Sequence, residues 1–122
     1  MMILIADDDP IQTTLLSSCL KKKGYRVTVA FDAFQAWFAA SRRTPDAIIL
    51  DIQMPGGTGR AVLRQLKSDP KTKQVPVIVV SGSIDSNEQS EVFKLGACEF
   101  LQKPVDLSLL LSCIDRLVGV PA

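Results

Sequence analysis

Four short apolar runs in this chain each lead into a polar residue with useful chemistry, and this pattern constrains the fold more than any other feature. The runs cover residues 3–6, 47–50, 77–80 and 100–102, and they lead into Asp7, Asp51, Ser81 and Lys103. Runs of this length, bounded by turn residues and separated by helical patterns, are typical of strands buried in a parallel sheet.

The ends of these strands predict a binding site. In an open parallel sheet, ligands bind at the carboxyl ends of the strands. Such an edge would gather carboxylates, a hydroxyl and an ammonium group around one point. That combination is typical of a site for a divalent metal and a phosphoryl group.

Helical patterns alternate with the strands along the chain. Asp9 and Pro10 are typical of a helix N-cap followed by proline at the first helical position, and Asp106 is expected to cap the last helix. We expect strands over 3–6, 25–30, 47–50, 77–80 and 100–102, and helices over 10–23, 33–41, a segment ending near 68, 85–96 and 107–118. This alternation predicts a single domain, 1–122, with a doubly wound α/β fold: a five-stranded parallel sheet with five helices on two faces.

The helices also predict which side chains are buried. The expected apolar faces are Leu15, Leu16, Cys19 and Leu20 in the first helix, and Ala61, Val62, Leu63 and Leu66 in the third. The second helix carries Phe34, Trp37 and Phe38, which no single helical face can bury together. An aromatic side chain exposed there would mark a partner site.

Composition excludes several classes of protein. The net charge is +1, from 14 Lys and Arg against 13 Asp and Glu, so nothing favours binding to nucleic acid or to a membrane surface. The absence of histidine argues against a structural zinc site and against Ser-His or Cys-His catalysis. Three cysteines without a CxxC pair indicate a reducing compartment. Since no apolar run approaches the roughly 20 residues of a membrane span, we expect a cytoplasmic protein.

The aspartates are the strongest candidates for metal ligands. Asp7 and Asp8 are adjacent, and like charges so close together oppose ionisation. Asp9 is interpreted as a helix cap. Because Asp51 ends another apolar strand, a shared Mg²⁺ site is favoured over the simpler interpretation of solvated strand ends.

Asp51 also has the chemistry of a nucleophile. A carboxylate can attack phosphorus and form an acyl phosphate. The hydroxyl of Ser81 could donate to a phosphoryl oxygen, and Lys103 could place a compact positive charge on another. Each residue has an ordinary structural explanation by itself, but the set at one end of the strands is specific.

These residues and their surroundings resemble the receiver domain of two-component response regulators, of which the chemotaxis regulator is the best-known minimal member. The resemblance covers residues 2–119. The matching motifs are ILIADDDP at 3–10, IILDIQMP at 48–55, PVIVVSG at 76–82, LGA at 95–97 and FLQKP at 100–104. The family implies a flavodoxin-like fold with strand order 2-1-3-4-5 and a phosphorylation-dependent switch in a two-component phosphorelay.

The resemblance assigns a role to each strand-end residue. Asp51 would be the phosphoacceptor, and its donor would be a histidine kinase or a histidine phosphotransfer protein. Mg²⁺ would be held by Asp7, Asp8, Asp51 and the backbone carbonyl of Gln53, with Asp8 as a direct ligand and Asp7 acting through water.

The resemblance also implies a switch. Ser81 would be the switch hydroxyl, Lys103 would face the phosphoryl group, Phe100 would be the switch aromatic residue, and a cis peptide would precede Pro104. Phosphorylation would pull Ser81 inward, let Phe100 rotate, and reshape the face of the fourth helix, fifth strand and fifth helix, where a partner or a second copy in a homodimer could bind. The charged residues of that face are Glu88, Glu91, Lys94, Glu99 and Arg116.

We expect no enzymatic activity beyond Mg²⁺-dependent self-phosphorylation from a phosphodonor and self-dephosphorylation. Gln53 and Ser83 would flank the path of the attacking water, and because neither is a carboxylate we expect slow to intermediate self-dephosphorylation.

Two other interpretations of the function stay open. A pseudo-receiver or scaffold would act by constitutive protein contact, against which the intact strand-end set argues. An aspartyl phosphatase would need an acid–base carboxylate where Gln53 stands.

Overall fold

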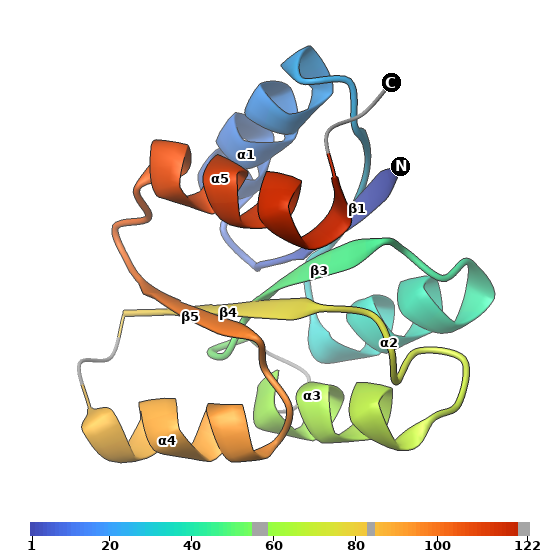
Figure 1. Cartoon of the computed structure of the whole chain (residues 1–122), viewed down its shortest axis with the longest axis vertical. Helices are drawn as coiled ribbons and strands as arrows, with labels where there is room; N and C mark the ends of the chain where they lie inside the picture. The colour runs from blue at the N-terminus through green and yellow to red at the C-terminus, as the bar shows by residue number, and fades with distance from the viewer. Residues whose placement is uncertain (55–58, 83–84, 120–122) are drawn as a thin grey trace.

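A five-stranded parallel sheet separates two layers of helices in the computed structural model, which describes residues 1–54, 59–82 and 85–119 (Figure 1). The strands are β1 (Met2–Ala6), β2 (Arg26–Ala30), β3 (Ala47–Asp51), β4 (Val77–Ser81) and β5 (Glu99–Gln102). The helices are α1 (Pro10–Lys22), α2 (Ala33–Arg42), α3 (Gly59–Ser68), α4 (Ser86–Lys94) and α5 (Leu107–Val118). The strand order, β2-β1-β3-β4-β5, confirms the expected flavodoxin-like fold.

The central strands are buried on both faces, which explains their unbroken apolar sequences. Successive residues point to opposite faces of the sheet. In β1, for example, Ile3 and Ile5 pack with α1 and α5 residues such as Leu16 and Leu110. Leu4 packs on the other side, where α2, α3 and α4 lie. The sheet is therefore the common wall of two apolar cores.

Strand register brings the predicted site residues to one edge. Ala6 is opposite Leu50, Asp51 is opposite Val80, and Ser81 is opposite Gln102. Because all neighbouring strands are parallel, the residues that end or follow β1, β3, β4 and β5 emerge on the same side of the sheet. This is the edge at which the sequence predicts binding.

Local capping signals fix several helix starts. The side chains of Asp9, Asp85 and Asp106 each accept a hydrogen bond from a backbone N–H in the first turn of α1, α4 and α5. Lys21 and Lys22 lie in the last turn of α1, and Gly24 follows the helix with a φ of 97°. The structure begins β2 one residue after the predicted start and extends α2 by one residue, which is the ordinary fraying of element ends.

Two predictions of buried helix residues were wrong. Leu15 is 47% exposed, because α1 turns Thr13, Leu16 and Leu20 toward the sheet and this stripe excludes position 15. Ala61 is also exposed, because α3 turns Val62, Leu63 and Leu66 toward the core and Ala61 lies outside that stripe.

The aromatic residues of α2 divide between core and surface. Trp37 packs against the core, whereas Phe34 is 69% exposed. Phe38 is exposed as well, and its ring stacks on Phe34 with centroids 6.0 Å apart. The prediction that one helical face cannot bury all three is therefore confirmed. Within the described residues, no helix combines the length and apolar character needed to cross a membrane.

Candidate functional site

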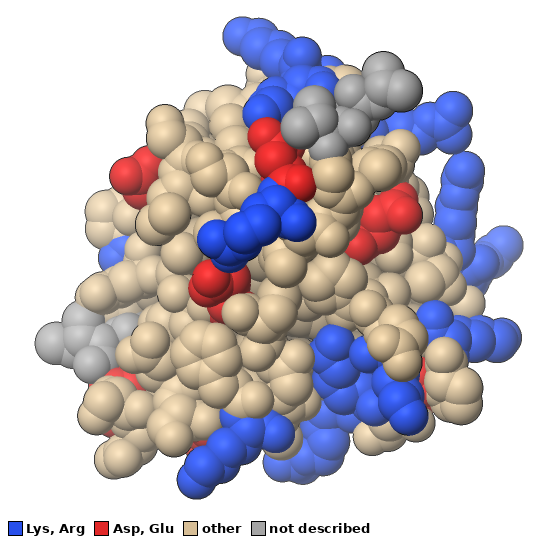
Figure 2. Space-filling view, viewed as in Figure 1, with Lys and Arg blue, Asp and Glu red and all other residues tan. Residues whose placement is uncertain are grey.

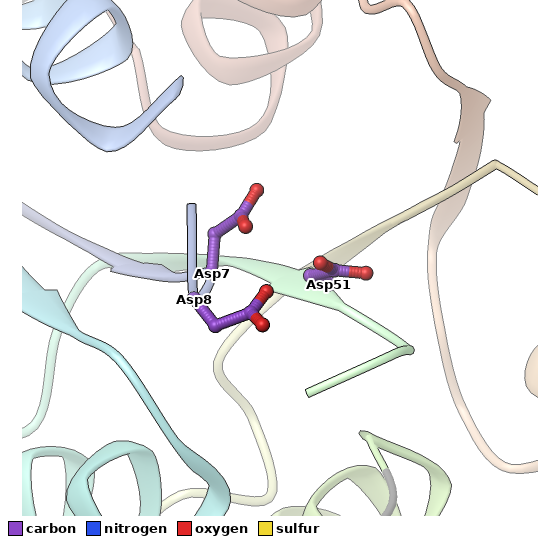
Figure 3. A group of neighbouring side chains, drawn as sticks. All are labelled: Asp7, Asp8 and Asp51. Carbon is purple, nitrogen blue, oxygen red and sulfur yellow. The ribbon is translucent and has the colours of Figure 1, made fainter. Parts of the chain in front are cut away.

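Three carboxylates meet where β1 and β3 end (Figure 3). Asp7 and Asp8 follow β1, and Asp51 is the last residue of β3. Each offers an oxygen that lies within 4.8 Å of the others. Asp7 and Asp51 are only 2% and 3% exposed, whereas Asp8 is open to solvent. The predicted acidic cluster is therefore present, with one side open to solvent.

Backbone amides fix two of the three carboxylates. The N–H of Asp9 donates to Asp7 Oδ1 at 3.0 Å, and the N–H of Gln53 donates to Asp51 Oδ1 at 2.9 Å. In both cases the donor is two residues beyond the carboxylate, where the chain turns as it leaves the strand. These turns leave the second oxygen of each carboxylate to face the cluster.

Lys103 supplies the positive charge of the site. Its Nζ donates to Asp7 Oδ2 at 3.1 Å and to Asp51 Oδ2 at 3.0 Å. Burial alone would lower the pKa of Lys103, but its hydrogen bonds and charge interactions with Asp51 and Asp7 outweigh burial and raise that pKa. Lys103 is therefore a charged bridge between the two buried aspartates. The peptide bond between Lys103 and Pro104 is cis, as the resemblance implied.

The electrostatic balance at Asp51 is unfavourable to its charge. Burial raises the pKa of Asp51, and the nearby charge of Asp7 acts in the same direction. The amide of Gln53 and the ammonium of Lys103 lower it, but they do not cancel the effect of burial. Three carboxylates against one ammonium leave the site short of positive charge. A hard divalent cation with oxygen preference would supply it, so the donor set fits Mg²⁺.

Ser81 ends β4, the strand that pairs with β3, but its hydroxyl does not face the carboxylates. The residue is buried at the end of β4, and its Oγ donates to Glu88 Oε1 of α4 at 2.8 Å. Its backbone carbonyl accepts from the N–H of Lys103 at 2.8 Å. The structure therefore brings Asp7, Asp8, Asp51 and Lys103 together and directs the hydroxyl of Ser81 toward α4.

Glu88 and Arg60 are the site neighbours that sequence reasoning missed. The side chain of Glu88 is only 11% exposed, and its Oε2 lies 3.6 Å from Arg60 Nη2 of α3. Arg60 Nε is buried and lies 3.1 Å from Glu91 Oε1, close enough for charge pairing although its geometry is not that of a hydrogen bond. The only signal in the sequence was a glutamate in the first turn of α4, which by itself indicates an ordinary helix start.

Other predicted residues are placed as follows. Phe100, in β5, is partly buried against the core on the α4 side of the sheet. Gln53 is exposed, and its backbone amide faces Asp51, as described above. Ser83, expected beside the path of an attacking water, lies outside the described residues, as does the segment 55–58.

The face of α4, β5 and α5 carries fewer free charges than its sequence suggests. Glu99 is paired with Arg116 at 3.0 Å, while Glu88 and Glu91 are paired with Arg60. The side chain of Glu88 is only 11% exposed, so it contributes little charge to the surface of this face. Figure 2, seen from the β5 side, shows mostly uncharged side chains with acidic and basic groups next to one another.

Comparisons of the sequence identify relatives over most of its length. A family model described as the response regulator receiver domain matches residues 3–115. The response regulator PleD of Caulobacter vibrioides is 36% identical over 115 residues, which is 94% of this chain but 25% of PleD. Protein PilH of Pseudomonas aeruginosa is 34% identical over 117 residues, covering 96% of this chain and 97% of PilH. The chain thus spans a quarter of one relative and nearly all of another.

Solved structures give the same result for the fold. A DNA-binding response regulator's signal receiver domain from Colwellia psychrerythraea superposes with a TM-score of 0.91 at 29% identity, covering 97% of this chain and 98% of that one. The receiver domain of a sensor histidine kinase from Pseudomonas aeruginosa superposes with a TM-score of 0.88 at 28% identity, covering 97% of each chain. That structure has a magnesium ion coordinated in its active site cleft.

Proposed function

Because this chain belongs to the response regulator receiver domain family of two-component signalling, we propose that it is a phosphorylation-dependent switch whose phosphoacceptor is Asp51. The phosphoryl group would come from a histidine kinase or a histidine phosphotransfer protein. The near-neutral net charge of +1 favours such protein partners over nucleic acid. We place this function in the cytoplasm.

One observation carries the proposal. The buried carboxylate of Asp51 has one oxygen fixed by the amide of Gln53, and its other oxygen lies beside the ammonium of Lys103. A nucleophile held in one orientation beside a fixed positive charge is arranged for phosphoryl transfer, which depends mainly on positioning and on charge stabilisation.

The reaction follows from these positions. An oxygen of Asp51 attacks phosphorus, the bond between phosphorus and the donor breaks, and the donor leaves with the electron pair of that bond. The product is an acyl phosphate on Asp51. Lys103 then balances the charge that the phosphoryl group adds.

Asp7, Asp8, Asp51 and the backbone carbonyl of Gln53 are the groups we assign to holding Mg²⁺. When bound, Mg²⁺ would neutralise charge that develops on the phosphoryl oxygens. The donor set supports this assignment, because the three carboxylates of the cluster exceed the one ammonium that faces them.

The switch would act through Ser81 and Phe100. A phosphoryl group on Asp51 offers new acceptor oxygens, and the hydroxyl of Ser81 can donate to one of them by leaving its present partner. Movement of Ser81 would open space for Phe100, and the α4–β5–α5 face would change its affinity for a partner or for a second copy in a homodimer.

The test is phosphorylation by a small donor. The chain is incubated with acetyl phosphate and Mg²⁺, and its intact mass is measured. We expect the parent to gain the mass of one phosphoryl group, and Asp51→Asn to gain none. Omission of Mg²⁺ should suppress labelling of the parent.

Two results would change the assignment. Equal labelling of Asp51→Asn would show that the acceptor is another residue. A parent that is not labelled at all would favour the alternative function, a pseudo-receiver or scaffold that acts by constitutive contact.

A further inference from the structure

Glu88 is a nearly buried carboxylate for which the proposed reaction has no use. It lies in the first turn of α4, and its two oxygens face different partners. Oε1 accepts the hydrogen bond from Ser81, and Oε2 lies near the guanidinium of Arg60. A carboxylate with so little exposure is stable only while such partners satisfy it.

We propose that Glu88 is a positioning residue that holds the hydroxyl of Ser81 on the α4 side of the sheet until Asp51 is phosphorylated. The phosphoryl group would then act by taking this hydroxyl from Glu88. The inference rests on the proposed function, because it needs a phosphoryl group on Asp51 as the competing acceptor.

The competition follows from the chemistry of a hydroxyl. Ser81 has a single O–H proton, so it can donate fully to one acceptor at a time. Glu88 already offers a charged acceptor at 2.8 Å, and hydrogen bonds to charged groups are stronger than those between neutral groups. Each state of the switch thus has its own strong acceptor for the same proton. The strength of the bond to Glu88 sets how strongly the unphosphorylated state is favoured.

Arg60 extends this effect to a third element. Its guanidinium lies between Glu88 and Glu91, so it joins the start of α3 to α4 by charge. Since Arg60 Nε makes no hydrogen bond within the described residues, the guanidinium is held mainly by charge and can follow Glu88 when Ser81 leaves. Loss of the hydrogen bond between Ser81 and Glu88 would therefore change the charge contacts at the first turns of α3 and α4.

The affinity for a phosphoryl mimic measures this restraint. Beryllofluoride with Mg²⁺ is titrated into the parent and into Glu88→Ala, and binding is followed by the amide resonances of the site. We expect Glu88→Ala to bind beryllofluoride roughly tenfold more tightly, because the mimic no longer competes with a charged acceptor for Ser81.

Glu91→Ala is the matched control. It removes a charge from the same helix and from the same arginine, but its carboxylate makes no hydrogen bond to Ser81 in the described structure. Its affinity should stay within about twofold of the parent.

A double-mutant cycle separates the hydrogen bond from a simple effect of charge. If Glu88 acts through the hydroxyl, the gain from Glu88→Ala should disappear when Ser81 is already replaced by Ala. If the gain persists in Ser81→Ala, Glu88 acts only by repelling an anion, and the proposal is overturned.

The four proteins of this cycle (the parent, Glu88→Ala, Ser81→Ala and the double variant) are also unfolded by heat without Mg²⁺ or beryllofluoride. Coupling between Ser81 and Glu88 should appear there as a non-additive loss of stability, because the hydrogen bond exists in the unphosphorylated chain. Additive losses would overturn the proposal even if the variants in Ser81 bind the mimic too weakly to measure.

Two kinds of failure can be told apart. If the parent itself does not bind beryllofluoride with Mg²⁺, the proposed function fails and this inference falls with it. If the parent binds but Glu88→Ala binds no more tightly, only the role of Glu88 is refuted. A direct reporter is the side-chain carboxyl carbon of Glu88, whose NMR shift should change on binding while that of Glu91 changes less.

Discussion

Removal of the Asp51 charge should stabilise this protein in the absence of Mg²⁺, although it removes the proposed nucleophile. The substitution Asp51→Asn keeps the size of the side chain and an oxygen that can accept from the amide of Gln53. It removes one of three negative charges from a cluster that has one ammonium. Burial raises the pKa of Asp51, so the ionised form of this carboxyl is disfavoured by folding.

The geometry gives the size of the effect. Oxygens of Asp7 and Asp8 lie within 4.8 Å of an Asp51 oxygen, which at an effective dielectric constant of about 20 corresponds to a repulsion of at least about 3.5 kcal/mol for each pair. The attraction between Asp51 Oδ2 and Lys103 Nζ, which are 3.0 Å apart, is about 5.5 kcal/mol and offsets most of the repulsion from Asp7 and Asp8. Solvent at the exposed Asp8 weakens the repulsion, and burial of Asp51 adds a desolvation cost. We therefore expect a net gain of about 1 kcal/mol for Asp51→Asn, or about 4 °C in Tm for a chain of this length.

Thermal unfolding followed by circular dichroism is the assay, first with EDTA and then with millimolar Mg²⁺. Mg²⁺ should raise the Tm of the parent more than that of Asp51→Asn, because a cation that binds only the folded chain stabilises it by an amount that grows with its affinity, and the variant lacks one of the proposed ligands. The advantage of the variant should therefore shrink or reverse when the metal is present.

Asp9→Asn is the matched control. Asp9 is an exposed N-cap next to the cluster, and Asn caps helices as well as Asp does. Its loss of charge should not stabilise the protein. If Asp51→Asn is less stable than the parent in EDTA at neutral pH, repulsion among the carboxylates does not govern this site and the reasoning is refuted.

Three further predictions concern the rest of the fold. The single O–H proton of Tyr25 is shared between Asp115 Oδ1 and the carbonyl of Gly119, so Tyr25→Phe should lower the free energy of unfolding by about 1.5 kcal/mol in chemical denaturation. The hydrogen bond from Lys23, followed by that from Tyr25, lowers the pKa of Asp115 below its ordinary 3.8. A carboxyl whose pKa is lower in the folded chain stabilises the fold at pH values above its unfolded pKa, and this stabilisation is lost as the pH falls through its folded pKa. Asp115→Asn should therefore make the loss of stability below about pH 4 less steep in an acid titration. Leu63→Ala should cost about 3 kcal/mol because Leu63 is fully buried, whereas the exposed Phe34 should tolerate Ala with a change below about 0.5 kcal/mol, as measured by urea unfolding.

The local elements and the chemistry at their ends can be recognised in the amino-acid sequence. Apolar runs of four residues predicted β3 and β4, because a strand buried on both faces cannot carry a polar residue in its interior. Capping at Asp9 and Asp106 was also predicted, since a cap depends on residues only two or three positions away. The order of the strands came from resemblance to a family, because periodicity does not say which strands are neighbours.

The pairing of charged groups from distant segments depends on how the helices pack. No pattern in the sequence indicates that Ser81 donates to Glu88 or that Glu88 faces Arg60. These residues meet only when α3 and α4 pack on the same face of the sheet. The exposure of Leu15 was equally hidden, because the rotation of α1 about its axis depends on how its neighbours fit against the sheet. Backbone propensity and capping act over a few residues and can be recognised in the sequence. The pairing of buried charges depends on distances of a few ångströms between elements, and those distances exist only once the two cores have packed.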